Sequence, residues 1–291
     1  MSIAVLGVAL AAALGVALPP GEVRADDTAT ARHLLLGVRA FKAERYDEAL
    51  VELRVVARAP DAPADLAFYL GPTLYKLQRY DEALAVFVAS RVPADALTDF
   101  YRGQTYYQLR LFRKARAVFA ELRARGLGPA LHDAAGRYVA TVDAAYQAPP
   151  AAASIDYYLA AGLERLATDP LVAAEYLDEA RQVEALAAQP HRHPEIVAAL
   201  AAAYNDSGRP QSTIALATAE RPAPPPGKTS ASPAAPPASP SAPDSELTWQ
   251  LARARAATGD AAHARPLLDA IIKSRGPHAA DATALLAKLA P

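Results

Sequence analysis

Two histidines, His191 and His193, form the only histidine cluster in the chain and are the first candidates for metal chemistry. Their imidazole rings flank Arg192, and Pro194 follows directly. Zinc sites take three or four protein ligands, and no carboxylate or cysteine stands nearby at ligand spacing. We therefore interpret this segment as a solvated polar turn between two helices, and the sequence predicts no metal site.

The rest of the sequence carries no pattern typical of an active site. It contains no His-Glu-x-x-His, no Gly-x-Ser-x-Gly and no phosphate-binding glycine loop. The acidic pairs Asp47-Glu48 and Asp81-Glu82 begin predicted second helices, where carboxylates stabilise the positive end of the helix dipole. We predict that the protein is not an enzyme and needs no cofactor. An enzyme with unfamiliar catalytic residues stays open as an alternative.

Composition narrows the classes of partner and of fold. The chain has 30 basic and 31 acidic residues, so its balanced charge gives no electrostatic reason to bind nucleic acid or an anionic membrane surface. The absence of cysteine excludes disulfides, thiolate metal sites and a cysteine nucleophile. Alanine and leucine dominate over β-branched, aromatic and glycine residues, which favours helix over strand.

The sequence contains internal repeats, and the helices that these repeats form must position any binding residues. The hexapeptide Arg45–Leu50 recurs 34 residues later as Arg79–Leu84. The dipeptide Leu36-Gly37 recurs at the same spacing as Leu70-Gly71. A third copy begins 32 residues further on, and its marker positions are Gly103, Phe112, Ala115 and Phe119, which correspond to Gly71, Tyr80, Ala83 and Phe87.

Each repeat reads as a hairpin of two helices. Two helices that cross closely need a small residue on each, and in the first repeat these are Gly37 and Ala49. An aromatic residue opens each second helix, Tyr46 in the first repeat, and is expected to wedge between neighbouring hairpins. Because one hairpin cannot bury its apolar face alone, the hairpins are expected to stack.

This pattern resembles the tetratricopeptide repeat in its period, in the leucine-glycine pair of the first helix and in the aromatic-x-x-alanine that opens the second. The resemblance is strong over residues 30–125, which hold three clear repeats. The usual tryptophan near the start of each unit is replaced by His33, Ala67 and Asp99. The resemblance implies an all-α fold, a right-handed superhelical solenoid of helix hairpins.

The pattern loosens after the third repeat. Residues 130–220 are predicted to form degenerate tetratricopeptide-like helices. Residues 222–244 are rich in proline, alanine and serine and are predicted to be a disordered loop, either a tether or a docking site for a proline-recognising partner. Residues 245–291 are predicted to form a last hairpin plus a capping helix. So small a unit rarely folds alone, so we expect it to pack back onto the fifth hairpin.

The N-terminal residues 1–25 are predicted to be a signal peptide. An apolar run from Ile3 to Leu18 precedes Val23-Arg24-Ala25, whose small residues suit cleavage after Ala25. The alternative is an uncleaved membrane anchor, although 16 apolar residues are few for a bilayer span. Either interpretation places the rest of the chain outside the cytoplasm, in the periplasm or secreted.

The resemblance also implies a binding surface, because the first helices of such arrays line a concave groove. Residues at equivalent positions in two units are expected to form aromatic ladders, Phe68 with Phe100 and Tyr75 with Tyr107. Pro72, between Phe68 and Tyr75 in the first helix of the second unit, predicts a bend in that helix or a local shift of the repeat frame. The predicted groove residues are Leu34, Val38, Phe41 and Lys42 in the first unit, Phe68, Tyr75 and Lys76 in the second, and Phe100, Gln104, Tyr107 and Gln108 in the third.

These features together predict a periplasmic scaffold or adaptor that binds a protein or peptide partner in an envelope complex. The groove positions lack the lysine and asparagine with which some family members clamp a C-terminal carboxylate, so an extended or helical peptide with apolar anchors is expected instead. A membrane-anchored structural subunit, with the N-terminal segment uncleaved, is the main alternative.

Overall fold

The computed structural model describes residues 25–60, 62–90, 95–125, 128–145, 152–187, 192–220 and 242–289. Within these ranges the chain forms α-helices, one short 3-10 turn at Ala64–Leu66, and no strand. The predicted all-α class is confirmed. Two predicted segments lie largely outside the described residues. These are residues 1–24 of the predicted signal peptide and residues 222–241 of the proline-rich segment.

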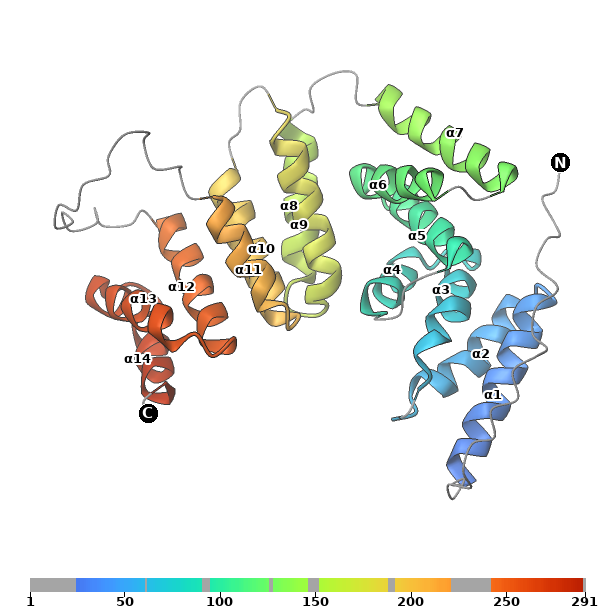
Figure 1. Cartoon of the computed structure of the whole chain (residues 1–291), viewed down its shortest axis with the longest axis horizontal. Helices are drawn as coiled ribbons and strands as arrows, with labels where there is room; N and C mark the ends of the chain where they lie inside the picture. Colours follow the sequence, from blue (N-terminus) through green and yellow to red (C-terminus); the bar gives the residue numbers. More distant parts are fainter. Residues whose placement is uncertain are drawn as a thin grey trace.

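The first half of the molecule holds three helix hairpins and a seventh helix. α1 packs on α2, α3 on α4, and α5 on α6, and α7 covers α6 (Figure 1). Each hairpin also contacts the next one along the chain. The helices are α1 (Ala25–Lys42), α2 (Tyr46–Ala57), α3 (Ala67–Lys76), α4 (Tyr80–Ala89), α5 (Ala96–Gln108), α6 (Phe112–Ala124) and α7 (Pro129–Ala145).

The second half repeats the hairpin plan, and its helices follow the first half along the long axis of the molecule in Figure 1. α12 begins two residues before the predicted end of the proline-rich segment, since proline is tolerated in a first helical turn. The helices are α8 (Ala152–Arg165), α9 (Pro170–Glu184), α10 (His193–Asp206), α11 (Pro210–Ala219), α12 (Ala242–Ala257), α13 (Ala261–Ser274) and α14 (Ala279–Lys288).

The same turn closes five of the hairpins. A residue in the left-handed region follows the first helix, and the next backbone N–H donates to a carbonyl five residues earlier, which is the Schellman arrangement. The fifth and sixth hairpins use glycine at this position, whereas the first three accept the small strain of a residue with a side chain. The left-handed residues are Glu44, Gln78, Arg110, Gly208 and Gly259.

Glycines sit where the two helices of a hairpin cross, as predicted from Gly37. A Cβ atom on Gly37 would lie 2.8 Å from the Leu53 side chain, and one on Gly103 would lie 2.8 Å from the Phe119 ring. Gly71 faces the ring of Phe87 still more closely. The close crossing therefore recurs in all three predicted repeats and explains why glycine recurs with it.

Replacing Gly71 by alanine should destabilise the protein by about 1–2 kcal/mol, because the added methyl group overlaps the buried Phe87 ring. Gly136→Ala in α7 is the matched control, since a Cβ there meets only Arg123 at 3.5 Å. That variant should gain about 0.5–1 kcal/mol from helix propensity alone. Urea unfolding of both variants checks the prediction, and equal effects would contradict it.

Pro72 lies inside α3, which runs on to Lys76. The missing N–H leaves the Phe68 carbonyl without its usual intrahelical donor. The hydroxyl of Thr73, one residue on, donates to the Tyr69 carbonyl at 2.6 Å. The helix thus accommodates the proline, and the repeat frame is unchanged, because Gly71 faces the ring of Phe87 just as Gly103 faces the ring of Phe119.

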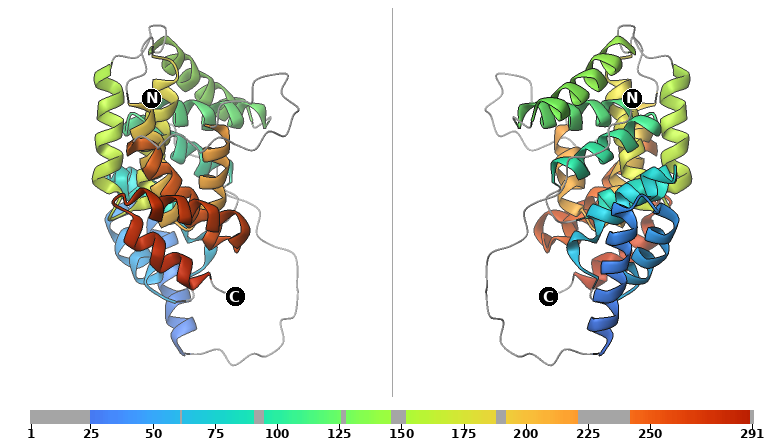
Figure 2. Two further views of the ribbon diagram at one scale, coloured as in Figure 1. Left: turned by 90° about the vertical axis from the view of Figure 1, so that its left-hand side faces the viewer. Right: turned by 90° about the vertical axis from the view of Figure 1, so that its right-hand side faces the viewer.

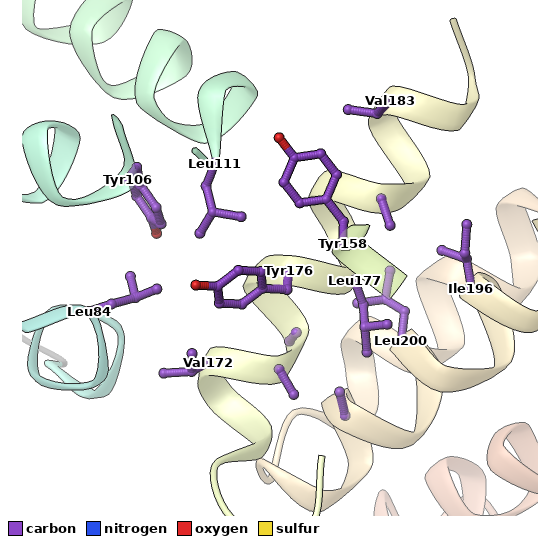
Figure 3. Packing of buried hydrophobic residues seen from close by; sticks show 14 of the residues in the cluster. Leu84, Tyr106, Leu111, Tyr158, Val172, Tyr176, Leu177, Val183, Ile196 and Leu200 are labelled. Carbon is purple, nitrogen blue, oxygen red and sulfur yellow. The ribbon is translucent and has the colours of Figure 1, made fainter. Parts of the chain in front are cut away.

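The two halves of the molecule meet where α9 packs against α4 and α6. Figure 3 shows Tyr176 and Tyr158 of the second half pointing toward Leu84, Tyr106 and Leu111 of the first. These side chains belong to one buried apolar cluster that extends from α4 to α11. The core of the molecule is therefore continuous across the boundary between the halves.

A buried carboxylate fixes the same junction. The side chain of Glu179 on α9 accepts backbone N–H groups of Arg113 and Lys114 at 2.8 and 3.1 Å, and so caps the first turn of α6. Burial is the largest influence on this carboxyl group and raises its pKa to about 7. Because the capping carboxylate of Glu179 belongs to α9, it fixes the start of α6 relative to α9.

The C-terminal helices pack back onto the fifth hairpin, as predicted. α12 packs against α10 and α11, and the Asn205 amide donates to the backbone and side-chain oxygens of Gln250 at 2.8 and 2.9 Å. Arg253 pairs with Asp206 at 2.8 Å. α14 packs on α13 and closes the end of the apolar cluster around Leu268. In the left view of Figure 2 the C-terminal helices are nearest the viewer, and in the right view α1 and α2 are nearest.

Candidate partner-binding groove

The predicted groove residues all lie on the first helices of the three hairpins, α1, α3 and α5. Lys42, Lys76 and Gln108 are exposed. The apolar and aromatic members are partly buried. Leu34, Phe41 and Tyr75 pack against the core of the first two hairpins, and Phe100 and Tyr107 pack against the larger core cluster. The first hairpin therefore uses much of its predicted groove surface for packing.

Aromatic side chains meet within each of the first three hairpins at a fixed spacing. The ring pairs Phe41 with Tyr46, Tyr75 with Tyr80, and Tyr107 with Phe112 have centroids 5.9, 5.5 and 5.5 Å apart. Each pair joins a first helix to the start of the second across the turn. The aromatic residue that was expected to wedge between hairpins thus packs on the ring five positions before it.

The predicted ladders between equivalent positions do not form among the described residues. Tyr75 instead contacts Tyr101 at 5.4 Å, and Phe41 contacts Tyr69 at 6.0 Å. Equivalent side chains on stacked helices point in the same direction and stay about one interhelical distance, roughly 8–10 Å, apart. The rings that meet are those that project toward each other from opposite sides of the interface.

A cationic and aromatic cluster occupies the middle of this surface. The ammonium group of Lys76 lies 5.9 Å from the Tyr46 ring and 5.7 Å from the Tyr101 ring, within range of a cation–π interaction. Burial raises the pKa of Tyr75 to about 12, and a hydrogen bond with Gln108 acts in the opposite direction. The tyrosines stay neutral at physiological pH, so Lys76 supplies the charge of the cluster.

Three of the predicted residues, Phe100, Gln104 and Tyr107, line a groove of about 310 Å³ between α5 and α7. Tyr138 forms its floor: its ring stacks on Phe119 at 4.4 Å, and its hydroxyl accepts a hydrogen bond from the Gln104 amide at 3.0 Å. Phe100 and Tyr107 contact the same ring at 6.0 and 5.2 Å. The other lining residues are Ala134, Arg137 and Thr141.

Sequence reasoning missed the tyrosines that complete this surface. Tyr69 and Tyr101 each stand next to a predicted groove residue, and Tyr138 lies on a helix that was not assigned to the groove. The recurring spacing of five between aromatic residues in each repeat was a signal for the ring pairs. No comparable pattern marked Tyr138, because its partners lie on α5 and α6.

His193 makes contacts that the sequence did not predict, whereas His191 lies outside the described residues. His193 begins α10, and its two ring nitrogens lie 3.2 Å from Glu184 and 2.7 Å from Glu220. The ring therefore joins the ends of α9 and α11 to the start of α10, where a solvated turn was expected. In the described part of the chain, no group of three or more histidine and carboxylate side chains has a geometry that could hold a metal ion.

No model of a known protein family matches this chain. No curated protein matches it either. Across the helices that the structure describes, none combines the length and the apolar character that a bilayer crossing requires.

Proposed function

We propose that this chain is an exported tetratricopeptide-type repeat protein, a right-handed superhelical solenoid that acts as a periplasmic scaffold or adaptor in an envelope complex. Support comes from the hexapeptide repeat and from the recurring Schellman turn and glycine crossing of the hairpins. The apolar run before Ala25 supports export. It binds its partners and catalyses no reaction.

The groove between α5 and α7, continued by the Lys76 cluster, is the observation that carries the binding function. Its walls are aromatic, and partly exposed tyrosines supply contact area at a low cost in conformational entropy. Gln104 offers hydrogen bonds at the floor. Arg137 lines one side, and neither Arg137 nor Lys76 forms an ion pair within the described residues. A peptide with apolar anchors and acidic flanking residues suits this surface.

Reversing the charge of Arg137 in the groove and of Lys76 in the neighbouring cluster should weaken partner binding by at least about tenfold, because cations at a binding surface steer and hold acidic partners. The variant is Lys76→Glu with Arg137→Glu, and both side chains are exposed, so the fold should be retained. Quantitative mass spectrometry of partners captured from the native envelope measures the loss.

The matched control is Lys273→Glu, which reverses an exposed charge on α13, far along the chain from the groove. It should recover the wild-type set of partners. If the groove variant and the control recover the same partners in equal amounts, the groove is not the binding surface.

The membrane-anchored alternative is favoured by the apolar run from Ile3 to Leu18. N-terminal sequencing of the mature protein separates the two proposals. A mature chain that begins at Asp26 supports export with cleavage, and a chain that retains the apolar run supports the anchor.

A further inference from the structure

A second groove lies between α12 and α14, at the end of the molecule opposite α1 (Figure 1). We call it the α12–α14 groove. It is built on the same plan as the groove between α5 and α7, because its lining residues on the first helix share the spacing i, i+4, i+7. These residues are Phe100, Gln104 and Tyr107 on α5, and Trp249, Arg253 and Ala256 on α12.

Smaller side chains make the α12–α14 groove the wider of the two. Ala256 stands where α5 has Tyr107, and Leu285 of α14 stands where α7 has Tyr138. The volume of the groove is about 620 Å³, against about 310 Å³ between α5 and α7. Trp249 is thus the one large ring in its lining, and the space that the tyrosines fill on the third hairpin is open here.

The indole ring of Trp249 is held in a fixed position. It stacks on the imidazole ring of His278, with centroids 5.2 Å apart and planes inclined by 12°. The imidazole is itself fixed, since its Nε2 atom lies 2.5 Å from a carboxylate oxygen of Glu246. The α12–α14 groove therefore presents a preorganised aromatic surface.

The charged groups around this groove already have roles within the fold. Arg253 forms the ion pair with α10 described above. Asp281 and Lys288 lie in the first and last turns of α14, where each stabilises the helix dipole. Arg265 of α13 donates to the backbone carbonyl of Leu289 at 2.6 Å. The groove thus makes no demand for a charged ligand, and an apolar occupant suits it.

Residues 222–241, which lead directly into α12, have the chemistry of such an occupant. Eight of these 20 residues are proline, and Lys228 is the only charged one. Residues 220–241 separate α11 from α12, which is a connection of 22 residues, whereas the other connections between successive hairpins have nine residues or fewer. Connections of this length in a compact protein often have a function of their own.

The position of this segment brings the groove within its reach. It ends where α12 begins, at Ala242, and Trp249 follows seven residues later, which is about 10 Å along a helix. Twenty proline-rich residues span up to about 60 Å. A tether of this kind gives an effective concentration on the order of 1 mM, so a Kd of about 0.1 mM is enough to fill the groove.

We propose that residues 222–241 bind in the α12–α14 groove of the same chain, with prolines packed on the Trp249 ring and against Leu285 and Leu289. Aromatic grooves recognise proline-rich sequences because these prefer one extended conformation and lose little entropy on binding. The groove is therefore a recognition site for proline-rich sequences. This contact does not depend on the groove between α5 and α7 or on the function proposed above.

Fluorescence of Trp249, the only tryptophan of the chain, tests the contact in the full-length protein. Deletion of residues 225–238 leaves eight residues between α11 and α12, as many as connect α9 to α10. The acrylamide quenching constant should rise at least about twofold, because the ring loses the prolines that cover it. A chain of unchanged length, with the eight prolines replaced by serine, should show the same rise. Circular dichroism verifies that each variant is folded.

Addition of the segment as a separate peptide tests the site. A synthetic peptide of residues 222–241 should restore the wild-type quenching of the deletion variant, with a Kd of about 0.1–1 mM. The same peptide with serine in place of proline should not. Ala284→Arg in the deletion variant fills the groove and should abolish peptide binding. Ala287→Arg is the matched control, since Ala287 is exposed on the same helix but does not line the groove, and it should bind the peptide normally.

Three results would overturn the proposal. The first is equal quenching in the wild type and the deletion variant, which would mean that the segment does not cover the groove. The second is a peptide that fails to bind the deletion variant, or that binds Ala284→Arg equally well. The third is wild-type quenching that increases on dilution, because the segment would then come from a second copy of the chain.

Discussion

Lys114→Met should destabilise the protein by about 3 kcal/mol, because it removes the cation from a buried cluster of carboxylates. The Lys114 ammonium group lies 3.2 Å from Glu175 and 2.5 Å from Asp178, and all three side chains are at most 21% exposed. The two carboxylates lie on α9, so the lysine joins the halves of the molecule. Without it, they remain buried with too little positive charge beside them.

The pH dependence of the Lys114→Met variant identifies the cause. In the wild type, burial is the largest single influence on Asp178 and alone would raise its pKa, but Lys114, with smaller contributions from Arg181 and Gln182, lowers the pKa overall. A lowered pKa means that this carboxylate stabilises the fold above its unfolded pKa and loses that contribution as the pH falls. In the variant the pKa rises, so acidification relieves the destabilisation. The difference in unfolding free energy should shrink from pH 7 to pH 4.

Lys273→Met provides the control, because Lys273 is exposed on α13. Its unfolding free energy should change by less than about 0.5 kcal/mol at any of these pH values. Urea titrations at several pH values measure both variants. A loss in Lys114→Met that stays constant with pH would show that packing of the lysine stem, rather than charge, causes it.

Tyr176→Ala should cost about 3–5 kcal/mol, which is the range for removing a buried aromatic side chain. Tyr176 is 2% exposed and lies in the cluster between Leu84, Leu111 and Tyr106 (Figure 3). The Arg165 guanidinium also lies 4.6 Å from its ring. Because the contacts with Leu84, Leu111 and Tyr106 join α9 to the first half, we expect the two halves to unfold separately in the variant.

Hydrogen exchange measures whether the halves uncouple. In the wild type, amides of α6 and α9 should exchange with similar protection, and in Tyr176→Ala the protection of the two helices should differ. Tyr157→Ala on the neighbouring α8 is the control, because Tyr157 is 49% exposed. It should change stability by less than about 1 kcal/mol. Equal losses in the two variants would contradict the role assigned to Tyr176.

Short repeated motifs in the sequence predicted where several helices of the first half begin and where they cross. The hexapeptide Arg45–Leu50 and its copy mark helices that begin at Tyr46 and Tyr80, and both are found there. Gly71 and Gly103 stand at close helix crossings, as their spacing indicated. These predictions succeeded because a hairpin is made by residues that lie within one repeat, and the repeat displays them three times.

The candidate groove was predicted only in part. Phe100, Gln104 and Tyr107 do line one groove, because equivalent positions of a repeat occupy equivalent faces. The floor residue Tyr138 was not foreseen, since α7 carries no recognisable copy of the repeat. The predicted ladders were wrong because helical spacing fixes the face of a residue but not the side chain it meets on the next helix.

The sequence by itself thus determined the all-α class and the pairing of helices into hairpins. Only the tertiary structure decided how the halves join. The contact between Tyr106 and Glu175 spans 69 residues, and the cap from Glu179 to Arg113 spans 66. No periodic signal records such a contact, because it depends on the shape of two assembled surfaces. Shape of that kind arises from the packing of many side chains at once, after the local structure has formed.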